Sequence, residues 1–145
     1  GKLVTTTDLL SIASMVCGKI EKKHEIVGLK DLVVVTGSSV IPTASVKLFL
    51  NKKEYVVSET GIGPVDAALR AISKIVDSME NVRLREFRIE ALTGGANAIA
   101  EVIIKVEDKE GNIVSARSAG PDIVMVSVEA MINGLNQLLQ KKKEK

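Results

Sequence analysis

The pattern that decides the fold lies in residues 44–79, ASVKLFLNKKEYVVSETGIGPVDAALRAISKIVDSM. Apolar side chains alternate with polar ones over residues 44–50, which is the period of a half-buried β-strand. A turn at residues 51–53 leads into residues 54–58, which we expect to form the return strand of a hairpin. Behind Pro64, apolar residues recur every three or four positions, the spacing of one helix face. The stretch therefore predicts a β-hairpin followed directly by an α-helix.

The same order of elements returns in the second half of the chain. The predicted elements there are strands over residues 87–91, 98–106 and 113–118, and a helix that Gly120-Pro121-Asp122 opens and that runs to about Leu139. Gly120 lies 59 positions after Gly61, and the same shift places the turn after Leu50 on the turn at Lys109. A repeat of this length is too long for a solenoid, so it indicates a duplicated unit.

A short β-branched run at residues 32–35, stopped by Gly37-Ser38-Ser39, adds a strand ahead of the first hairpin. We therefore predict an α+β fold of two pseudo-symmetric βββα units, in which antiparallel strands pack with helices. The units span about residues 32–80 and 82–140.

A separate helix is expected ahead of the two units. Residues 5–8, Thr-Thr-Thr-Asp, resemble a helix start, and an apolar stripe follows at helical spacing to about Lys23. We assign residues 1–28 to a linker helix and residues 29–145 to the main domain, which ends in a basic tail at 141–145.

The composition excludes several classes of function. The chain has 145 residues, 46% hydrophobic and 26% charged, which fits one globular domain. Aromatic residues make up only 2%, too few for the stacking platforms that bind single-stranded nucleic acid. The net charge of +2 comes from the tail, because residues 141–145 hold four lysines and one glutamate. The body offers no basic surface for a phosphate backbone, so we expect no nucleic-acid partner.

The cellular compartment is predicted from cysteine use and from the lack of targeting patterns. A lone Cys17 excludes an intrachain disulfide framework and fits a reducing compartment. No apolar run approaches the roughly 18 residues that a membrane-spanning helix needs, and no signal peptide opens the chain. We expect a cytoplasmic protein without a membrane partner.

Candidate catalytic groups are few. The single histidine, His24, lies in a charged run at the end of the predicted linker helix, where a solvated role is the ordinary one. With one histidine and one cysteine, no zinc-like cluster of these residues can form. Serines 38, 39 and 127 have no histidine near them in the sequence to form a nucleophile pair. We interpret the chain as carrying no catalytic site.

The Gly61-x-Gly63 turn would let the backbone approach a ligand, but it is not a dinucleotide fingerprint. The position where that fingerprint has its third glycine holds Asp66. The turn leads into a helix start, whose free N–H groups favour a carboxylate. On this motif alone we favour a tight strand-to-helix turn without a ligand, because such turns are common. A double-stranded RNA-binding domain, with a similar order of elements, is disfavoured because this helix start has no lysine.

The last predicted helix is apolar on more than one face between Ile123 and Leu139. One face would cover its own sheet, and a second copy of the chain could cover the other. We therefore expect a homodimer.

Three motifs in combination identify a family resemblance. They are Gly61-Ile62-Gly63-Pro64-Val65-Asp66-Ala67, Ala91-Leu92-Thr93-Gly94-Gly95-Ala96-Asn97-Ala98, and Asp122-Ile123-Val124-x-x-Ser127 with a terminal Leu135-Asn136-x-Leu138. Over about residues 30–139 the chain resembles the C-terminal regulatory domain of α-isopropylmalate synthase and of its relative citramalate synthase. The resemblance implies two βββα units, a homodimer, and binding of the end-product amino acid that inhibits the catalytic barrel.

The resemblance also implies what lies outside this chain. The parent enzyme would be an acyltransferase that condenses acetyl-CoA with a 2-oxo acid, and its N-terminal catalytic barrel would hold the divalent metal and acetyl-CoA. We expect no cofactor in the regulatory domain itself. Since the chain begins with Gly1 rather than Met, we expect a fragment of such an enzyme, with the predicted linker helix as the end of the connecting subdomain.

Carried onto this chain, the family's effector pocket falls at the start of the helix that follows Gly63. The implied effector-binding residues are Gly63, Pro64, Val65 and Asp66, with a wall of Leu84, Phe87, Ala91, Ala98, Ala100 and Ile123. Both pseudo-related helix starts would supply N–H groups for the α-carboxylate. The effector would be leucine for an isopropylmalate synthase and isoleucine for a citramalate synthase; a dimerisation module without an effector is the third alternative.

Overall fold

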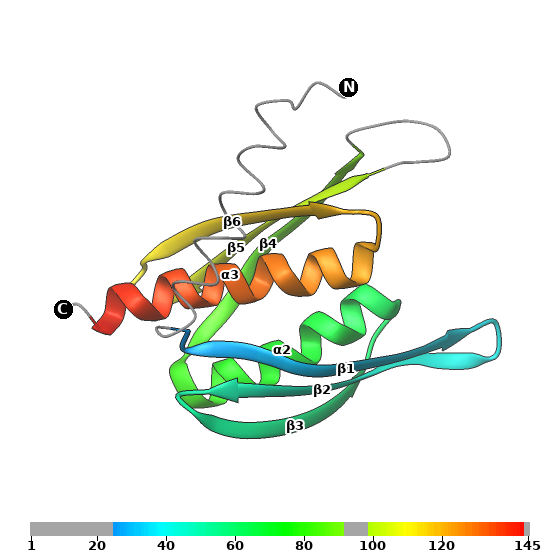
Figure 1. The fold of residues 1–145 in the computed structure, drawn as a ribbon, viewed down its shortest axis with the longest axis horizontal. Helices are drawn as coiled ribbons and strands as arrows, with labels where there is room; N and C mark the ends of the chain where they lie inside the picture. Colours follow the sequence, from blue (N-terminus) through cyan, green and yellow to red (C-terminus); the bar gives the residue numbers. More distant parts are fainter. Residues whose placement is uncertain (1–24, 92–98, 144–145) are drawn as a thin grey trace, which may run out of the picture.

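Two three-stranded antiparallel sheets, each followed by a helix, make up the described part of the chain (Figure 1). The structure is a computed structural model and describes residues 25–91 and 99–143. The first unit consists of β1 (Val27–Gly37), β2 (Val40–Leu50), β3 (Lys53–Thr60) and α2 (Pro64–Glu80). The second consists of β4 (Val82–Ala91), β5 (Ala100–Asp108), β6 (Ile113–Gly120) and α3 (Ile123–Lys143). The predicted α+β fold of two βββα units is confirmed, and the predicted linker helix lies outside the described residues.

The middle strand of the first sheet, β2, shows the predicted alternation. Ala44, Val46 and Leu48 are fully buried, whereas the polar residues between them remain partly exposed. The turn to β3 consists of two residues with positive φ, Asn51 at 53° and Lys52 at 67°. This left-handed pair matches the twist of the strands that it joins, which explains why so short a turn suffices.

The first strand is longer than the sequence predicted. It covers Val27–Gly37 rather than residues 32–35, and it pairs with β2 through a tight turn at residues 38 and 39. The predicted domain boundary after residue 28 therefore falls inside a strand. The pattern was hidden because Lys30 occupies a bulge between Leu29 and Asp31, which shifts the alternation by one residue.

The second sheet repeats this irregularity. In β4 a bulge leaves Arg85 without a partner between Leu84 and Glu86, 55 positions after Lys30. Both bulged residues are basic and reach a glutamate at 2.7 Å: Lys30 Nζ meets Glu54, and Arg85 Nη1 meets Glu107. The shared bulge supports the duplication, and it explains why β4 also begins before the predicted residue 87.

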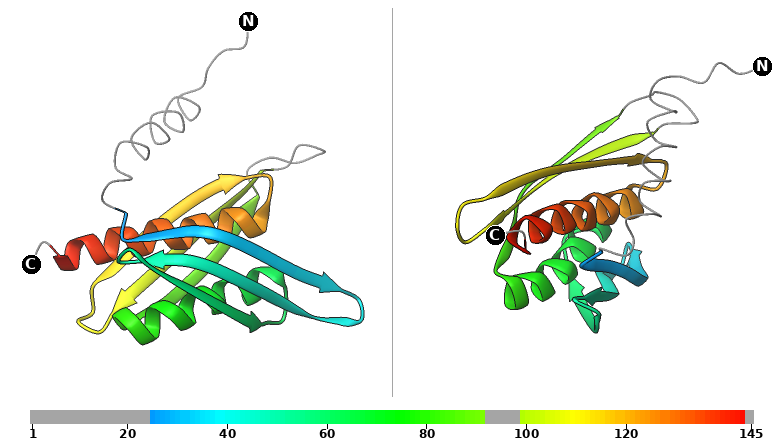
Figure 2. Two further views of the ribbon diagram at one scale, coloured as in Figure 1. Left: turned by 60° about the horizontal axis from the view of Figure 1, so that its bottom comes forward. Right: turned by 60° about the vertical axis from the view of Figure 1, so that its left-hand side comes forward.

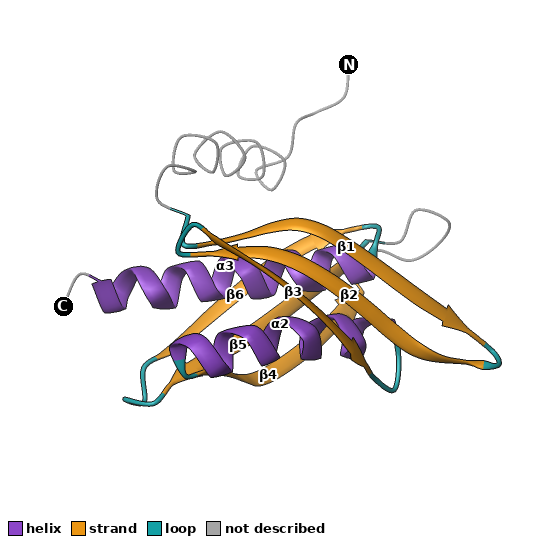
Figure 3. Cartoon of the chain, turned by 90° about the horizontal axis from the view of Figure 1, so that it is seen from below, coloured by secondary structure: helices purple, strands orange, loops and turns teal. Residues whose placement is uncertain are grey.

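The two helices lie side by side between the sheets (Figures 2 and 3). Helix α2 packs on β2 and β3, and α3 packs on β5 and β6. Each helix also touches the first strand of the other unit, α2 against β4 and α3 against β1. The core is therefore continuous across the two units. The N-terminal ends of both helices lie at the same end of the molecule (Figure 1).

The second apolar side of α3 is covered within the chain. Met131, Leu135 and Leu138 are fully buried, and α3 contacts both α2 and β1 of the first unit. Our expectation that a second copy of the chain covers this side of α3 is therefore wrong, and this side gives no reason for dimerisation. The extra apolar face exists because α3 packs against both units.

Candidate effector pocket

A cavity of about 490 Å³ lies between the first turns of α2 and the strand β4. Its lining residues are Ile62, Gly63, Pro64, Val65, Asp66, Leu69, Arg70, Ser73, Leu84 and Phe87. Six of the ten residues predicted for the effector site are among them: Gly63, Pro64, Val65, Asp66, Leu84 and Phe87. The volume falls within the range that small-molecule sites occupy.

The turn into α2 requires glycine at position 61. The Gly61 N–H donates to the carbonyl of Pro42 at 3.0 Å, which anchors the turn to β2. A Cβ on this residue would lie 2.5 Å from the backbone nitrogen of Ala67 and 2.6 Å from Asp66 Oδ2. Any residue with a side chain at this position would therefore force the turn or the helix start to shift.

The first turn of α2 has no side-chain cap. Gly63 is the N-cap residue in an extended conformation, and its carbonyl accepts the first helical hydrogen bond from Ala67 at 2.9 Å. Pro64 has no N–H, but Val65 and Asp66 present theirs without a capping side chain. The residues of this helix start line the cavity, and backbone N–H groups without a cap at a helix N-terminus favour an anion.

A carboxylate and a guanidinium lie at the rim of the cavity. Asp66 Oδ2 accepts a hydrogen bond from the Ile62 N–H at 2.9 Å and pairs with Arg70 Nε at 3.0 Å. Asp66 and Arg70 are four residues apart, so they share one face of α2. The Arg70 side chain is 61% exposed and that of Asp66 is 34% exposed, which leaves the pair accessible to a ligand.

Apolar side chains form the rest of the cavity. Leu69 comes from α2, and Leu84 and Phe87 come from β4, where both are half-buried against the core. Val65 and Pro64 close the side next to the turn. An apolar chamber with one opposite-charge pair at its rim suits a small aliphatic molecule that carries both charges.

Three of the predicted site residues that the structure describes do not line this cavity. Ala91 ends β4 four residues beyond Phe87 and pairs with Ala100 on β5. Ile123 begins α3 and packs against the core, and Ala98 lies outside the described residues. Ala91 and Ala100 lie at the end of β4 and the start of β5, and Ile123 lies at the start of α3.

Sequence reasoning missed the lining residues Ile62, Leu69, Arg70 and Ser73. The signal was present for three of them, because positions 69, 70 and 73 follow Asp66 at helical spacing on one side of α2. Extending the predicted site along the helix from Asp66 would have found them.

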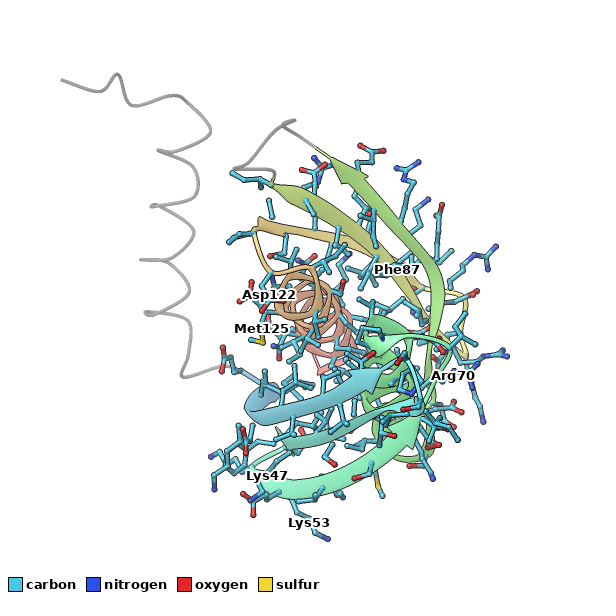
Figure 4. The ribbon with its side chains drawn as sticks, turned by 90° about the vertical axis from the view of Figure 1, so that its right-hand side faces the viewer. Lys47, Lys53, Arg70, Phe87, Asp122 and Met125 are labelled. Atoms are coloured by element: carbon cyan, nitrogen blue, oxygen red, sulfur yellow. The ribbon has the colours of Figure 1, made fainter. Side chains whose placement is uncertain are left out.

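The start of α3 differs from that of α2. Asp122 Oδ1 accepts hydrogen bonds from the N–H groups of Val124 at 3.0 Å and Met125 at 3.3 Å. The prediction that both helix starts would offer free N–H groups is therefore wrong for α3, since its own N-cap occupies them. Figure 4 shows Asp122 and Met125 on one side of the molecule, and Arg70 and Phe87 on the other.

The described residues add two further findings. Across residues 25–91 and 99–143, no group of three His, Cys, Asp or Glu side chains is arranged to hold a metal ion. Within the same ranges, no helix has both the length and the apolar composition needed to cross a membrane.

Comparison with known proteins assigns the family. Residues 3–139 match the family model described as the LeuA allosteric (dimerisation) domain. The chain belongs to this family. The match covers nearly the whole of both βββα units.

Individual relatives carry two different names. A "Probable 2-isopropylmalate synthase" of Methanosarcina acetivorans is 50% identical over 143 residues, 99% of this chain and 28% of the relative. The "2-isopropylmalate synthase" of Methanocaldococcus jannaschii is 44% identical over 144 residues, 99% of this chain and 27% of the relative. A "Putative (R)-citramalate synthase CimA" of Methanothermobacter thermautotrophicus is 45% identical over 143 residues, 99% of this chain and 28% of the relative. The chain thus spans little more than a quarter of these proteins.

Proposed function

We propose that this LeuA allosteric domain binds leucine in the cavity at α2 and thereby mediates feedback inhibition of a 2-isopropylmalate synthase in leucine biosynthesis. The observation that carries the proposal is the cavity itself, which combines an uncapped helix start at Gly63 with an apolar wall at Leu84 and Phe87. The free N–H groups would receive the α-carboxylate, and the wall would receive the branched side chain.

The parent protein would supply the chemistry that this domain regulates. We propose a parent acyltransferase that condenses acetyl-CoA with a 2-oxo acid, with the divalent metal and acetyl-CoA held in its catalytic part. The effector would inhibit by binding the inactive arrangement of the parent more tightly than the active one, since a ligand without such a difference shifts no equilibrium.

A citramalate synthase that responds to isoleucine is the nearest alternative. The relatives with the two names are about equally similar to this chain, at 44–50% identity, so the names do not separate the two effectors. Leucine and isoleucine differ only in where the side chain branches. The shape of the apolar wall at Phe87 would therefore decide between them.

Calorimetric titration of the 145-residue chain with leucine, isoleucine and valine tests effector binding. We expect saturable heat from leucine and weaker binding of the other two. Tightest binding of isoleucine would assign the domain to a citramalate synthase. No heat from any of the three, with a sample that is folded and dimeric, would overturn effector binding and leave a dimerisation module.

The two phenylalanines of the chain provide a matched control for the site. Phe87 lines the cavity, whereas Phe49 lies on the outer face of the first sheet and is 38% exposed. Phe87→Ala should weaken leucine binding by about tenfold, because a fully buried side-chain contact with an aliphatic ligand contributes on the order of 1–3 kcal/mol. Phe49→Ala should leave the affinity unchanged, and equal effects of the two would argue against this cavity.

Dimerisation is the second part of the proposal, and an apolar hairpin supports it. No charged residue occurs between Asp31 and Lys47, and this stretch forms the β1–β2 hairpin that projects beyond α2 (Figure 1). Exposed apolar side chains on it are Val33, Val35, Val40 and Ile41, each 47–68% accessible. Such a patch on both copies would suit a two-fold contact.

Sedimentation of an Ile41→Lys variant tests this placement. We expect the variant to sediment as a monomer at concentrations where the unsubstituted 145-residue chain is dimeric, because the interface of the variant would bury an unpaired charge. Ile113→Lys, at a 45% exposed position on the second sheet, is the control and should stay dimeric. A dimeric Ile41→Lys variant would place the contact elsewhere.

A further inference from the structure

The outer face of the first sheet offers an apolar surface that the function proposed above leaves largely unused. We propose that residues 5–23, the predicted linker helix, dock along their apolar stripe on this face of the same chain. Such docking is separate from effector binding and from dimerisation, because it ties a surface of the domain to the segment of chain that leads into it.

The half of this face nearest the β1–β2 turn has no charged side chain. The helices lie on the other side of the sheet (Figure 3), and Val33 and Val35 are 53% and 50% exposed on the outer side. The hydroxyl groups of Ser45 and Ser58 are hydrogen-bonded to each other, so they keep a partner when the face is covered. In register, this uncharged half consists of two rows: Val33, Ser45 and Ser58, then Val35, Thr43 and Thr60.

The outer face of the second sheet is built differently, although the two units are duplicates. Lys105 pairs with Glu86 at 3.2 Å across its strands. Ile103, an apolar residue on that face, lies in register between Arg88 and Arg117 and is only 8% exposed. Long charged side chains thus cover the apolar residue of the second sheet, whereas the first sheet leaves its valines open. The difference indicates that another segment covers the first sheet.

The segment ahead of β1 has the charge pattern to provide this cover. Residues 9–18 hold no charged side chain, and the charges of the segment gather at residues 19–25, next to β1. The charged residues of the outer face, Asp31, Lys47 and Glu54, lie at the same end, near the start of β1. When the segment runs antiparallel to β1, its uncharged part therefore meets the uncharged half of the face. An apolar stripe on a helix requires such a surface.

The lengths of the segment and the face also agree. The apolar stripe runs from Leu9 to Ile20, over which an α-helix advances about 17 Å. A β-strand covers the same distance in about five residues, which corresponds to β1 from Asp31 to Thr36. The tip of the hairpin, with its exposed Ile41, lies beyond this length and stays free for the two-fold contact proposed above.

The chain enters the domain on the correct side for this docking. Gly28 belongs to the outer face, because it pairs with the exposed Phe49 and follows the buried Val27. The Glu25 carboxylate lies 3.5 Å from the position that a Cβ on Gly28 would occupy, so Glu25 is also on the outer side. Only residues 24–26 separate the end of the predicted helix from β1, which is a usual length for such a connection. The segment therefore begins its course next to the face.

Reaction of Cys17 with 5,5′-dithiobis(2-nitrobenzoate) tests the docking, because this only cysteine lies on the apolar stripe. We expect the folded 145-residue chain to react at least a hundredfold more slowly than the chain unfolded in urea. Val33→Lys places a charge in the uncharged half of the face and should raise the rate at least tenfold. Ile12→Lys, on the stripe itself, should do the same.

Two matched variants serve as controls, and both should react within twofold of the unsubstituted chain. Ile113→Lys changes the outer face of the second sheet, and Ser11→Lys changes the side of the predicted helix opposite the stripe. Circular dichroism melting checks that each variant is folded.

Three results would overturn the docking. The first is a folded chain in which Cys17 reacts as fast as in the unfolded chain. The second is a protected Cys17 whose rate Val33→Lys leaves within twofold, which places the stripe on another surface. The third is protection that disappears when the chain is diluted until it is monomeric, which assigns the cover to a second copy. Leucine titration is a separate measurement, so the docking can fail while the proposed function stands.

Discussion

Asn136 of α3 is hydrogen-bonded to the backbone of Val27, 109 positions earlier in the chain. Its Oδ1 accepts from the Val27 N–H at 2.8 Å and from the Ile26 N–H at 2.8 Å, and its Nδ2 donates to the Val27 carbonyl at 2.8 Å. One amide thus satisfies three backbone groups at the start of β1. The contact joins the last helix of the second unit to the first strand of the first unit.

Replacing Asn136 by alanine should cost about 2–3 kcal/mol, because it leaves partly buried backbone donors and an acceptor without partners. Urea unfolding followed by circular dichroism measures the difference. Asn133, which is exposed on the same helix, is the matched control, and Asn133→Ala should change the unfolding free energy by less than about 0.5 kcal/mol. Similar losses for the two variants would show that the link from α3 to β1 contributes little.

Replacement by alanine should lower stability at Gly61 and have little effect at Gly63. A Cβ at Gly61 would overlap the helix start at Ala67, so Gly61→Ala should destabilise the chain by about 1–3 kcal/mol. A Cβ at Gly63 would meet nothing within 4 Å and the backbone there is extended, so Gly63→Ala should stay within about 0.5 kcal/mol of the parent. Thermal melts compare the two, and equal melting temperatures would contradict the tight turn at Gly61.

The sequence predicted most of the fold because two periods and one repeat were visible in it. Period two over residues 44–50 and helical spacing behind Pro64 both hold in the structure. The start of β1 escaped notice because the bulge at Lys30 interrupts the alternation, and a bulge depends on pairing with β2. The burial of the second apolar side of α3 also could not be predicted from the sequence. An apolar helix face does not specify whether the same chain or another copy of the chain buries it, and tertiary packing decides between the two.

Part of the candidate cavity was named before the structure was known. The glycines indicated only a turn at a helix start, and the family resemblance then named residues 63–66, which line the cavity. Arg70 was missed although it follows Asp66 by four positions on the same face of α2, because the family resemblance named only residues 63–66 of this segment. The capping of α3 by Asp122 was missed for a different reason: the repeat suggested equivalent helix starts, although the residues at 63 and 122 differ.

The turn between β5 and β6 should make stability sensitive to acid through Asp108. Burial on its own would raise the pKa of Asp108, but hydrogen bonds from the Asn112 side chain and backbone and from the Glu110 N–H hold the pKa below its usual value. A carboxylate with a lowered pKa in the folded state adds stability above its unfolded pKa of about 3.9, and that contribution is lost as pH falls through the folded value.

We therefore expect Asp108→Asn to flatten the acid side of the stability curve. Urea unfolding between pH 7 and pH 2.5 should show that the parent chain loses more stability than the variant below about pH 4. Asn112→Ala removes one donor to Asp108 Oδ2 and should reduce the acid dependence in part. Parallel curves for the parent chain and Asp108→Asn would show that the turn does not lower this pKa.

Changing the N-cap residue of each helix should show whether the uncapped start of α2 contributes to effector binding at the expense of stability. Gly63→Asp would give α2 the side-chain cap that Asp122 gives α3, with a gain of about 0.5 kcal/mol in unfolding free energy. The new carboxylate would occupy the N–H groups of Val65 and Asp66 and repel the carboxylate of an effector, so leucine binding should fall more than tenfold. Asp122→Ala is the matched change in the second unit: it should cost about 1 kcal/mol through the lost cap and leave leucine binding unchanged, because the cavity lies at α2. Calorimetry and urea unfolding on the same two samples measure both effects. A Gly63→Asp variant that still binds leucine with the parent affinity would show that the helix start takes no part in holding the carboxylate.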